Sequence, residues 1–206
     1  MSKDFFAHKA GSYEQTPSRV DNVANIANAV IAAVNLDKTQ HLLDFGSGTG
    51  LLLERLAPLV GRITAVDVSP AMNRQLAAKL ADLPCAVDIV EVDLCQASLA
   101  QQFDGVVSSM TLHHIADIAA MFEKFHTLLT PGGFITIADL DSEDGSFHSE
   151  DTGVHHFGFD RAAIAAAASA AGFTGAQVSD ASCIRKTQGD YRVFLLTAHK
   201  PADVST

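Results

Sequence analysis

The chain has 206 residues, a length that suits one compact α/β domain with a sizeable core. Hydrophobic residues make up 48% of the chain and its mean hydropathy is +0.17, which excludes an intrinsically disordered protein. The formal net charge of −10 at pH 7 argues against non-specific binding to nucleic acid or to an anionic membrane, so we expect a small-molecule or protein partner.

No segment of the sequence has the features of a secretion signal or a membrane span. The first residues, Met-Ser-Lys-Asp-Phe-Phe, lack a long apolar stretch, and no apolar run reaches the roughly 20 residues needed to cross a bilayer. We therefore expect a cytoplasmic protein. Its cysteines, Cys85, Cys95 and Cys183, have no C-x-x-C spacing, so we expect reduced thiols rather than a disulfide framework or a structural zinc site.

The most informative stretch is His41-Leu-Leu-Asp-Phe-Gly-Ser-Gly-Thr-Gly50, in which an apolar run ends in three alternating glycines. A helical pattern follows from Leu51, so the stretch predicts a strand, a tight turn and a helix. Because glycine has no Cβ, Gly46, Gly48 and Gly50 allow a ligand to lie against the main chain. The unpaired N–H groups at the start of the helix favour an anionic or carboxylate-bearing ligand.

The spacing of these glycines separates the stretch from two nucleotide-binding motifs. The dinucleotide motif G-x-G-x-x-G would need a glycine where Leu51 stands. A phosphate-binding loop would need Lys and then Ser or Thr after its last glycine, where Leu51 and Leu52 stand. Both interpretations are weakened.

Apolar runs alternate with helical patterns along the rest of the chain, which predicts an α/β fold with a doubly wound sheet and a ligand at the carboxyl ends of its strands. A helix is expected from Ser18, where apolar residues begin to recur at helical spacing. Asp67 ends the second strand, about twenty residues past the glycines, where an acid accepts hydrogen bonds from ribose hydroxyls. Ser69 and Pro70 predict the start of the next helix. Further strands are expected at 85–92, 103–109, 134–138, 175–180 and 191–199, with helices at 117–129 and 160–171.

The acidic-x-Gly-x-Gly-x-Gly pattern, followed by acids at the ends of the next two strands, resembles the class I S-adenosylmethionine-dependent methyltransferases. The resemblance covers residues 41–138 most strongly and is similar to the small-molecule branch that includes ubiquinone and menaquinone biosynthesis methyltransferases. It implies a mostly parallel seven-stranded sheet with one antiparallel strand. It also implies S-adenosylmethionine as cofactor and S-adenosylhomocysteine as product. The implied cofactor-binding residues are Asp44, Gly46, Ser47, Gly48, Gly50, Asp67, Val68, Met72, Asp93, Leu94, Ser109 and Met110.

The resemblance assigns a part of the cofactor to several of these residues. Asp44 would position the amino-acid end and Asp67 the ribose. Asp93 would accept a hydrogen bond from the adenine amine, while the N–H of Leu94 would serve a ring nitrogen. A turn or helix-capping role is the alternative for Asp93.

Other residues are expected to make apolar or main-chain contacts with the cofactor. Val68 and Met72 would pack on the adenine, with ordinary core packing as the alternative. Ser109 and Met110 would border the sulfonium, largely through main-chain atoms. Tyr13 would face the active site from the N-terminal segment, or serve only for packing.

Three histidines are the candidate catalytic residues. By the resemblance, His113 and His114 follow the fourth strand, close to the transferred methyl group, and His156 lies in the loop after the fifth strand. A base is needed only if the acceptor atom arrives protonated, and a histidine with a pKa near neutral suits that role. Capping or packing is the alternative role for His113 and His114, and lid packing or simple solvation is the alternative for His156.

The segment from Asp139 to Gly158 combines acids with His148, His155 and His156. Carboxylates and imidazoles can bind a metal, but no helix-spaced pair of ligands is present, so we predict none. In this fold, loops after the strands build the substrate pocket, and we interpret the segment as a substrate lid.

The sequence therefore predicts a single methyltransferase domain over residues 1–206. Its parts would be an N-terminal helical cap (1–36), a cofactor-binding core (41–139), a lid loop (140–158), and a C-terminal helix and hairpin (159–200). The resemblance implies in-line methyl transfer to a small molecule, achieved mainly by positioning. Two alternatives stay open: a non-catalytic S-adenosylmethionine-binding or regulatory protein, and an adenosine-cofactor oxidoreductase. The acceptor atom and the oligomeric state are not predicted.

Overall fold

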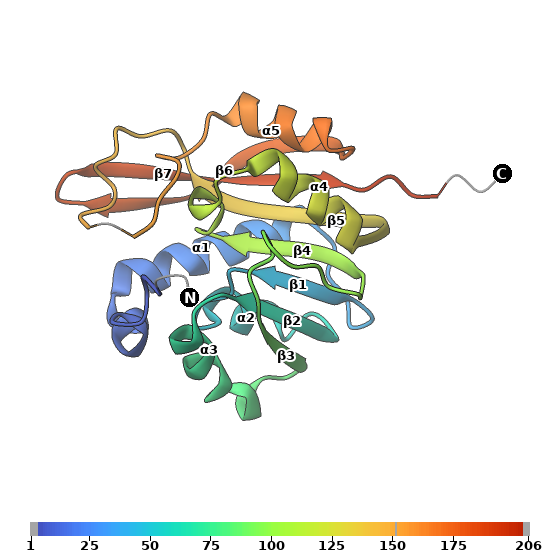
Figure 1. Ribbon diagram of the computed structural model, residues 1–206, viewed down its shortest axis with the longest axis horizontal. Helices are drawn as coiled ribbons and strands as arrows, with labels where there is room; N and C mark the ends of the chain where they lie inside the picture. Colours follow the sequence, from blue (N-terminus) through green and yellow to red (C-terminus); the bar gives the residue numbers. More distant parts are fainter. Residues whose placement is uncertain (1–3, 151, 204–206) are drawn as a thin grey trace.

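The computed structural model describes residues 4–150 and 152–203. It contains one seven-stranded sheet in the order β3-β2-β1-β4-β5-β7-β6 (Figure 1). Five strands pair in parallel and β7 runs antiparallel to both of its neighbours, which confirms the predicted architecture. The strands are β1 (His41–Phe45), β2 (Arg62–Asp67), β3 (Ala86–Glu91), β4 (Phe103–Ser109), β5 (Leu129–Leu140), β6 (Thr174–Lys186) and β7 (Gly189–His199).

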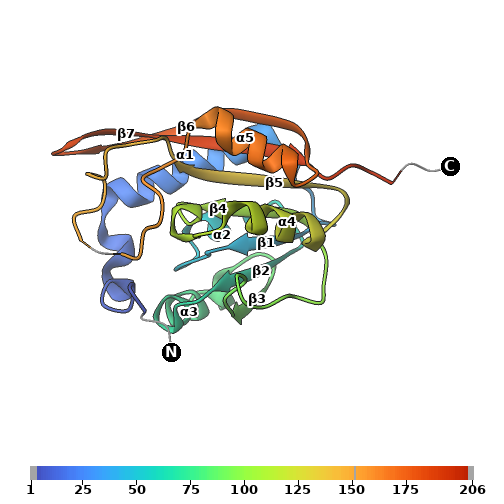
Figure 2. The same cartoon turned by 45° about the horizontal axis from the view of Figure 1, so that its top comes forward.

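Helices cover both faces of the sheet, as Figure 2 shows. Residues of α1, α2 and α3 join one apolar cluster, and residues of α4 and α5 join the cluster on the opposite face. The α-helices are α1 (Pro17–Ala33), α2 (Leu51–Leu56), α3 (Pro70–Ala77), α4 (Ile118–Leu128) and α5 (Arg161–Ala170). Three 3-10 helices, η1 (Ala10–Gln15), η2 (Leu80–Asp82) and η3 (Leu112–His114), complete the described elements.

Side-chain caps explain where three of these helices begin. Ser69 Oγ accepts a hydrogen bond from Met72 N at the start of α3, with Pro70 in the first helical position. Asp117 caps α4 and Asp160 caps α5 in the same way. Each cap satisfies an N–H group that would otherwise have no partner in the first turn.

The last three strands are longer than the sequence predicts. β5 begins at Leu129 rather than Phe134, because the Pro-Gly-Gly turn expected to precede the strand lies within it as a bulge. Gly132 N donates to Lys200 O, so this bulge is held by the segment that follows β7. β6 and β7 form a hairpin that continues to Lys186 and Gly189; its outer part is mostly exposed and polar, which hides the strand pattern.

The parallel strands end on the side of the molecule where two irregular segments lie (Figure 1). The first is the N-terminal segment, residues 4–16, which contains η1. The second is the lid loop, residues 140–158, which runs from the end of β5 towards α5. In the described residues, no helix combines the length and the apolar character needed to cross a membrane.

Candidate functional site

The glycine turn leaves β1 beside the point where the strand order reverses between β1 and β4. Gly46, Gly48 and Gly50 have φ angles of 70°, 55° and 88°, in the left-handed region that side chains disfavour. A Cβ on Gly46 would lie 2.2 Å from the side chain of Thr111, whereas a Cβ on Gly48 would meet nothing within 4 Å. The turn therefore packs closely against the exit of β4 at Gly46 and faces open space at Gly48.

Hydrogen bonds from β2 hold this turn in place. Gly46 N and Ser47 N donate to Val66 O, at 2.8 and 3.1 Å. Gly48 N donates to Asp67 Oδ2 and Ser69 N donates to Asp67 Oδ1, both at 2.8 Å. Asp67 thus fixes the turn itself, a role that the sequence did not predict. Because each carboxylate oxygen can accept two hydrogen bonds, capacity for the predicted ribose contacts is left.

Four buried polar atoms near the turn have no hydrogen-bond partner among the described residues. They are Asp44 Oδ2, Ser47 Oγ, Thr49 Oγ1 and Ser109 Oγ. A buried polar group without a partner costs about 1–3 kcal/mol, so such a concentration indicates a polar ligand. Ser47 and Ser109 are predicted cofactor residues, whereas Thr49 is an addition from the structure.

Asp44 has the most unusual electrostatic environment of this group. Its side chain is 1% exposed, and burial, with the nearby Asp67 as a second cause, raises its pKa to about 7. Burial also raises the pKa of Asp67. A ligand with a positive charge and N–H donors, such as an α-amino group, would stabilise both ionised carboxylates. The residues at this turn therefore fit the amino-acid end of S-adenosylmethionine.

The part of the site that is predicted to bind the adenine is partly covered by other residues. Val68 is 59% exposed, which leaves an apolar surface available next to Asp67. Met72 is 3% exposed, because Ala10, Phe6 and Tyr13 of the N-terminal segment pack with it. Contact between Met72 and an adenine stays a prediction.

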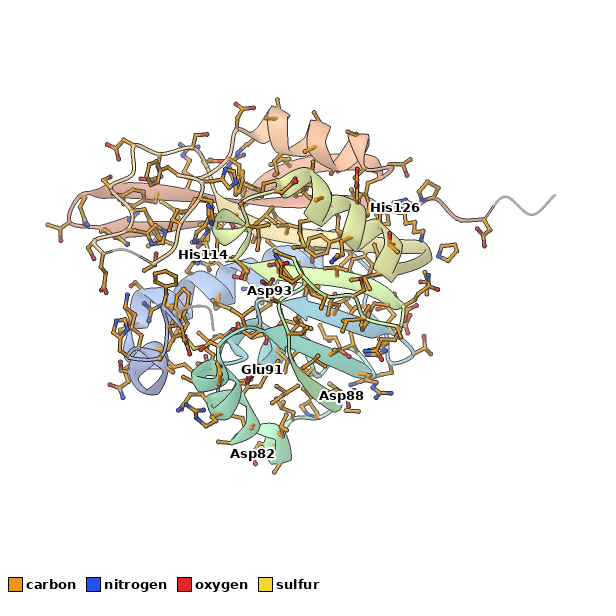
Figure 3. The ribbon with its side chains drawn as sticks, viewed as in Figure 1. Asp82, Asp88, Glu91, Asp93, His114 and His126 are labelled. Carbon is orange, nitrogen blue, oxygen red and sulfur yellow. The ribbon has the colours of Figure 1, made fainter. Side chains whose placement is uncertain are left out.

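The segment that follows β3 contains the other residues that are predicted to contact the adenine. Asp93 is exposed, and its Oδ1 accepts a hydrogen bond from Cys95 N at 2.8 Å, which is the turn role considered as an alternative. Leu94 is buried and its carbonyl accepts a hydrogen bond from Lys124 Nζ. Figure 3 labels Asp93 and Glu91 along this exit. The two predicted adenine contacts remain untested.

Met110 adopts an unusual backbone conformation at the end of β4. Among the described residues, it is the one non-glycine residue with a positive φ, of 57°. Its N–H donates to Ala138 O at 2.8 Å, and the next residue, Thr111, packs against Gly46. Strain of this kind persists where the surrounding structure enforces it, and it is concentrated at functional sites.

Next to Thr111, His113 and His114 lie where the lid loop and the N-terminal segment meet; Figure 3 labels His114 at this end of the sheet. His113 is 2% exposed, and its Nδ1 lies 2.7 Å from Asp139 Oδ1. His114 Nδ1 lies 3.3 Å from Gly153 O, and burial lowers the pKa of His114 to about 4. The structure therefore places both predicted histidines together in a shielded position.

His156 has a different environment from the other two candidate histidines. Its Nε2 lies 2.9 Å from Ile115 O and its ring lies 5.1 Å from that of Phe159. These contacts occupy one ring nitrogen and favour a packing role. Its role as a base stays a prediction.

Contacts between the N-terminal segment and the rest of the protein close this end of the site. Asp4 Oδ2 accepts a hydrogen bond from Ser69 Oγ at 2.9 Å. Lys9 Nζ forms an ion pair with Glu150 of the lid loop at 3.1 Å. Tyr13 is near Asp67, and burial raises the pKa of its hydroxyl. Both irregular segments thus cover the strand ends in this conformation.

The described part of the lid loop and its surroundings contains no group of three or more His, Cys, Asp or Glu side chains arranged to hold a metal ion.

Comparisons with known proteins agree with this geometry. A family model described as a methyltransferase domain matches residues 42–133. An uncharacterised methyltransferase of Mycobacterium bovis is 37% identical over 102 residues, which is 48% of this chain and 50% of that protein. A ubiquinone biosynthesis O-methyltransferase of Xanthomonas axonopodis pv. citri is 32% identical over 111 residues, 52% of this chain and 46% of that protein.

Solved structures show the same fold. The N-methyltransferase NodS from Bradyrhizobium japonicum, in complex with S-adenosyl-L-homocysteine, is similar with a TM-score of 0.70 and 16% identity, over 90% of this chain and 89% of that chain. This chain spans about half the length of the curated relatives described above. These similar proteins are named for different acceptor atoms, oxygen in one case and nitrogen in the other.

Proposed function

We propose that this chain is a class I S-adenosylmethionine-dependent methyltransferase, and that it transfers a methyl group from S-adenosylmethionine to a small-molecule acceptor. The match of residues 42–133 to a methyltransferase-domain model and the similarity to named methyltransferases support this proposal. The observation that carries the proposal is the set of partnerless polar atoms around Asp44, at the carboxyl ends of β1 and β4. Ligands of open α/β sheets bind where the strand order reverses, which is the position of this set.

Three residues at the strand ends would bind different parts of the cofactor. Asp44, ionised by the approach of a cation, would pair with the α-amino group. Asp67 would accept hydrogen bonds from the ribose while it holds Gly48 N and Ser69 N. The exposed side chain of Val68 would cover one face of the adenine.

The chemistry places few demands on the protein. S-adenosylmethionine supplies an activated methyl group on a positively charged sulfur, so its leaving group is already good. The main-chain atoms around Ser109 and Met110 and the histidines after β4 would orient the acceptor for in-line attack. The N-terminal segment and the lid loop would exclude water from the reacting atoms.

The net charge of the chain and the covering of the strand ends support a small-molecule acceptor. The net charge of −10 disfavours nucleic acid, and the N-terminal segment and lid loop together leave the strand ends covered rather than exposed as a flat surface. A small molecule can be enclosed there. We therefore propose a small-molecule acceptor rather than a macromolecular one.

Calorimetry with S-adenosylhomocysteine on the wild type and on Asp67→Ala tests the proposal. We expect micromolar affinity for the wild type, weakened about tenfold to hundredfold by the substitution, because charge-assisted hydrogen bonds to the ribose are lost. Since Asp67 also supports the glycine turn, the same titrations are made with a 2′,3′-dideoxy analogue of S-adenosylhomocysteine. A direct ribose contact predicts a smaller effect of Asp67→Ala on the analogue.

Equal weakening for both ligands would show that Asp67 acts through the turn alone. Absence of binding to the wild type would contradict the proposed cofactor. Incubation with S-adenosylmethionine labelled in its methyl group, together with a panel of small-molecule acceptors, then tests catalysis. Binding without transfer to any acceptor would favour the non-catalytic alternative.

A further inference from the structure

Three imidazole rings gather beside the glycine turn, and one of them comes from the lid loop. The ring centroids of His113 and His114 lie 4.3 Å apart. His148, from the lid loop, lies 5.2 Å from His113 and 6.1 Å from His114. The sequence pointed to His113 and His114 as catalytic candidates but considered His148 only as a possible metal ligand, because nothing in the pattern places that residue beside the end of β4.

A buried carboxylate, Asp139, holds the ring of His113 in place. Asp139, at 0% exposure, accepts hydrogen bonds from His113 N at 3.1 Å and from Leu140 N at 2.7 Å. Its Oδ1 also lies 2.7 Å from His113 Nδ1. Because a carboxylate accepts hydrogen bonds, we assign Nδ1–H as the donor in this contact, which leaves Nε2 as the ring nitrogen available to an acceptor. This Nε2 makes no hydrogen bond with any described residue.

The lid histidine also presents a nitrogen without a partner. His148 Nδ1 lies 3.2 Å from Thr152 Oγ1, and its Nε2 is buried without a hydrogen-bond partner among the described residues. Burial, with His113 and His114 as further causes, lowers the pKa of His148 to about 4. At neutral pH, His148 is therefore uncharged.

The surroundings of these rings are aromatic. Phe147 meets the edge of His148 at 4.8 Å, and Phe6 meets the edge of His114 at 5.4 Å. Asp139 is already engaged by three donors, so it offers little capacity to a cationic acceptor group. A neutral group with an O–H donor, attached to an apolar body, is the chemistry that suits this cluster.

We propose that the acceptor is a neutral hydroxyl compound and that His113 takes its proton, with Asp139 as the positioning residue and His148 as a contact from the lid loop. This inference rests on the proposed function and assigns the acceptor atom that the comparisons leave open. The acceptor hydroxyl would lie between His113 Nε2 and the transferred methyl group.

The proton and electron balance is complete with the groups already named. The acceptor oxygen forms a bond to the methyl carbon, and the electron pair of the broken C–S bond stays on sulfur, which becomes the neutral thioether of S-adenosylhomocysteine. The hydroxyl proton moves to His113 Nε2. The resulting imidazolium is stabilised by the Asp139 carboxylate and passes its proton to solvent when the lid opens.

The test uses three small probes on the protein saturated with S-adenosylhomocysteine, whose binding is measured first. 4-Methylphenol carries the hydroxyl, 4-methylanisole carries the same oxygen without its hydrogen, and 4-methylaniline carries an amine. We expect 4-methylphenol to bind at least tenfold more tightly than either of the others, because only it donates an O–H hydrogen bond into the shielded site. His113→Asn keeps an N–H donor for Asp139 and removes Nε2, so this preference should fall about tenfold or more.

Further variants separate the proposed roles from a structural one. His148→Gln should also reduce the preference for 4-methylphenol, and it tests the proposal even if His113→Asn fails to fold. The matched control is His199→Asn, an exposed histidine at the opposite end of β7, which should leave the preference unchanged. Nitrogen-15 spectra of the imidazoles should show a proton on Nδ1 of His113 in the wild type and a shift towards the other tautomer in Asp139→Asn.

Two kinds of result would overturn the inference while leaving the proposed function intact. One is normal binding of S-adenosylhomocysteine with no preference for 4-methylphenol, or with 4-methylaniline bound equally well. The other is an unchanged preference in both His113→Asn and His148→Gln. Failure of S-adenosylhomocysteine to bind would instead contradict the proposed function itself.

Discussion

The raised pKa of Asp44 predicts that cofactor binding depends on pH in a range that is easily measured. Asp44 is buried beneath the glycine turn, and its pKa is raised from 3.8 to about 7. The proposed pairing of Asp44 with the α-amino group of the cofactor requires the ionised form, so it predicts that binding releases the proton that Asp44 holds below pH 7. The affinity for S-adenosylhomocysteine should therefore weaken about tenfold between pH 8 and pH 6, since each unit below the pKa reduces the ionised fraction tenfold.

Calorimetry at these two pH values, in buffers with different ionisation enthalpies, measures both the affinity and the protons released. Asp44→Asn removes the titrating group and preserves its shape, so the variant should bind more weakly at pH 8 and show little pH dependence. 5′-Methylthioadenosine, which lacks the amino-acid end, is the matched ligand and should show no dependence in either protein. His114 and His148, with pKa values near 4, do not titrate in this range.

The same carboxyl group affects the stability of the free protein. Asp44 keeps its proton up to about pH 7 in the folded state but only up to about 3.8 in the unfolded chain, so stability is lost as the pH rises between these values. The loss is at most on the order of 4 kcal/mol. Asp44→Asn should therefore be more stable than the wild type at pH 8 and similar to it at low pH. Equal affinity of the wild type at pH 6 and pH 8, or an unchanged slope in Asp44→Asn, would refute this reasoning.

Two further substitutions test how the sequence builds the site and the fold. Gly46→Ala places a Cβ 2.2 Å from Thr111 at a φ of 70°, so urea denaturation should show a loss of about 1–3 kcal/mol, whereas Gly11→Ala, where a Cβ meets nothing within 4 Å, should have little effect. Asp160→Ala removes the cap of α5 and should lower the free energy of unfolding by about 1 kcal/mol in the same measurement. Asp203→Ala, at an exposed position, is the control. Equal stability of the variant and its control, in either pair, would contradict the assigned role.

The sequence was most informative where local chemistry decides the structure. The glycines after β1 and the caps Ser69 and Asp160 act over a few residues, so their positions could be predicted. The Pro-Gly-Gly turn was placed before β5 instead of within it, because the bulge depends on Lys200, about seventy residues away.

The contacts at the site that the sequence did not predict also depend on segments that are distant along the chain. Asp67 was recognised as a strand-end acid, but its hydrogen bond to Gly48 N depends on how β2 lies against the turn. His148 and Asp139 reach His113 from different segments, and no spacing in the sequence records that approach. Residues that act together across the sheet could be found only once the strand order was known.

The N-terminal segment and the lid loop, which cover the strand ends, contact each other as well as the rest of the protein. Glu150 of the lid loop pairs with Lys9 and His8, and a Cβ on Gly153 would press on the ring of Phe5. Under the proposed function, these contacts predict that the two segments open together. The rate of this opening would then limit turnover, and S-adenosylhomocysteine and the methylated product would leave during the same opening.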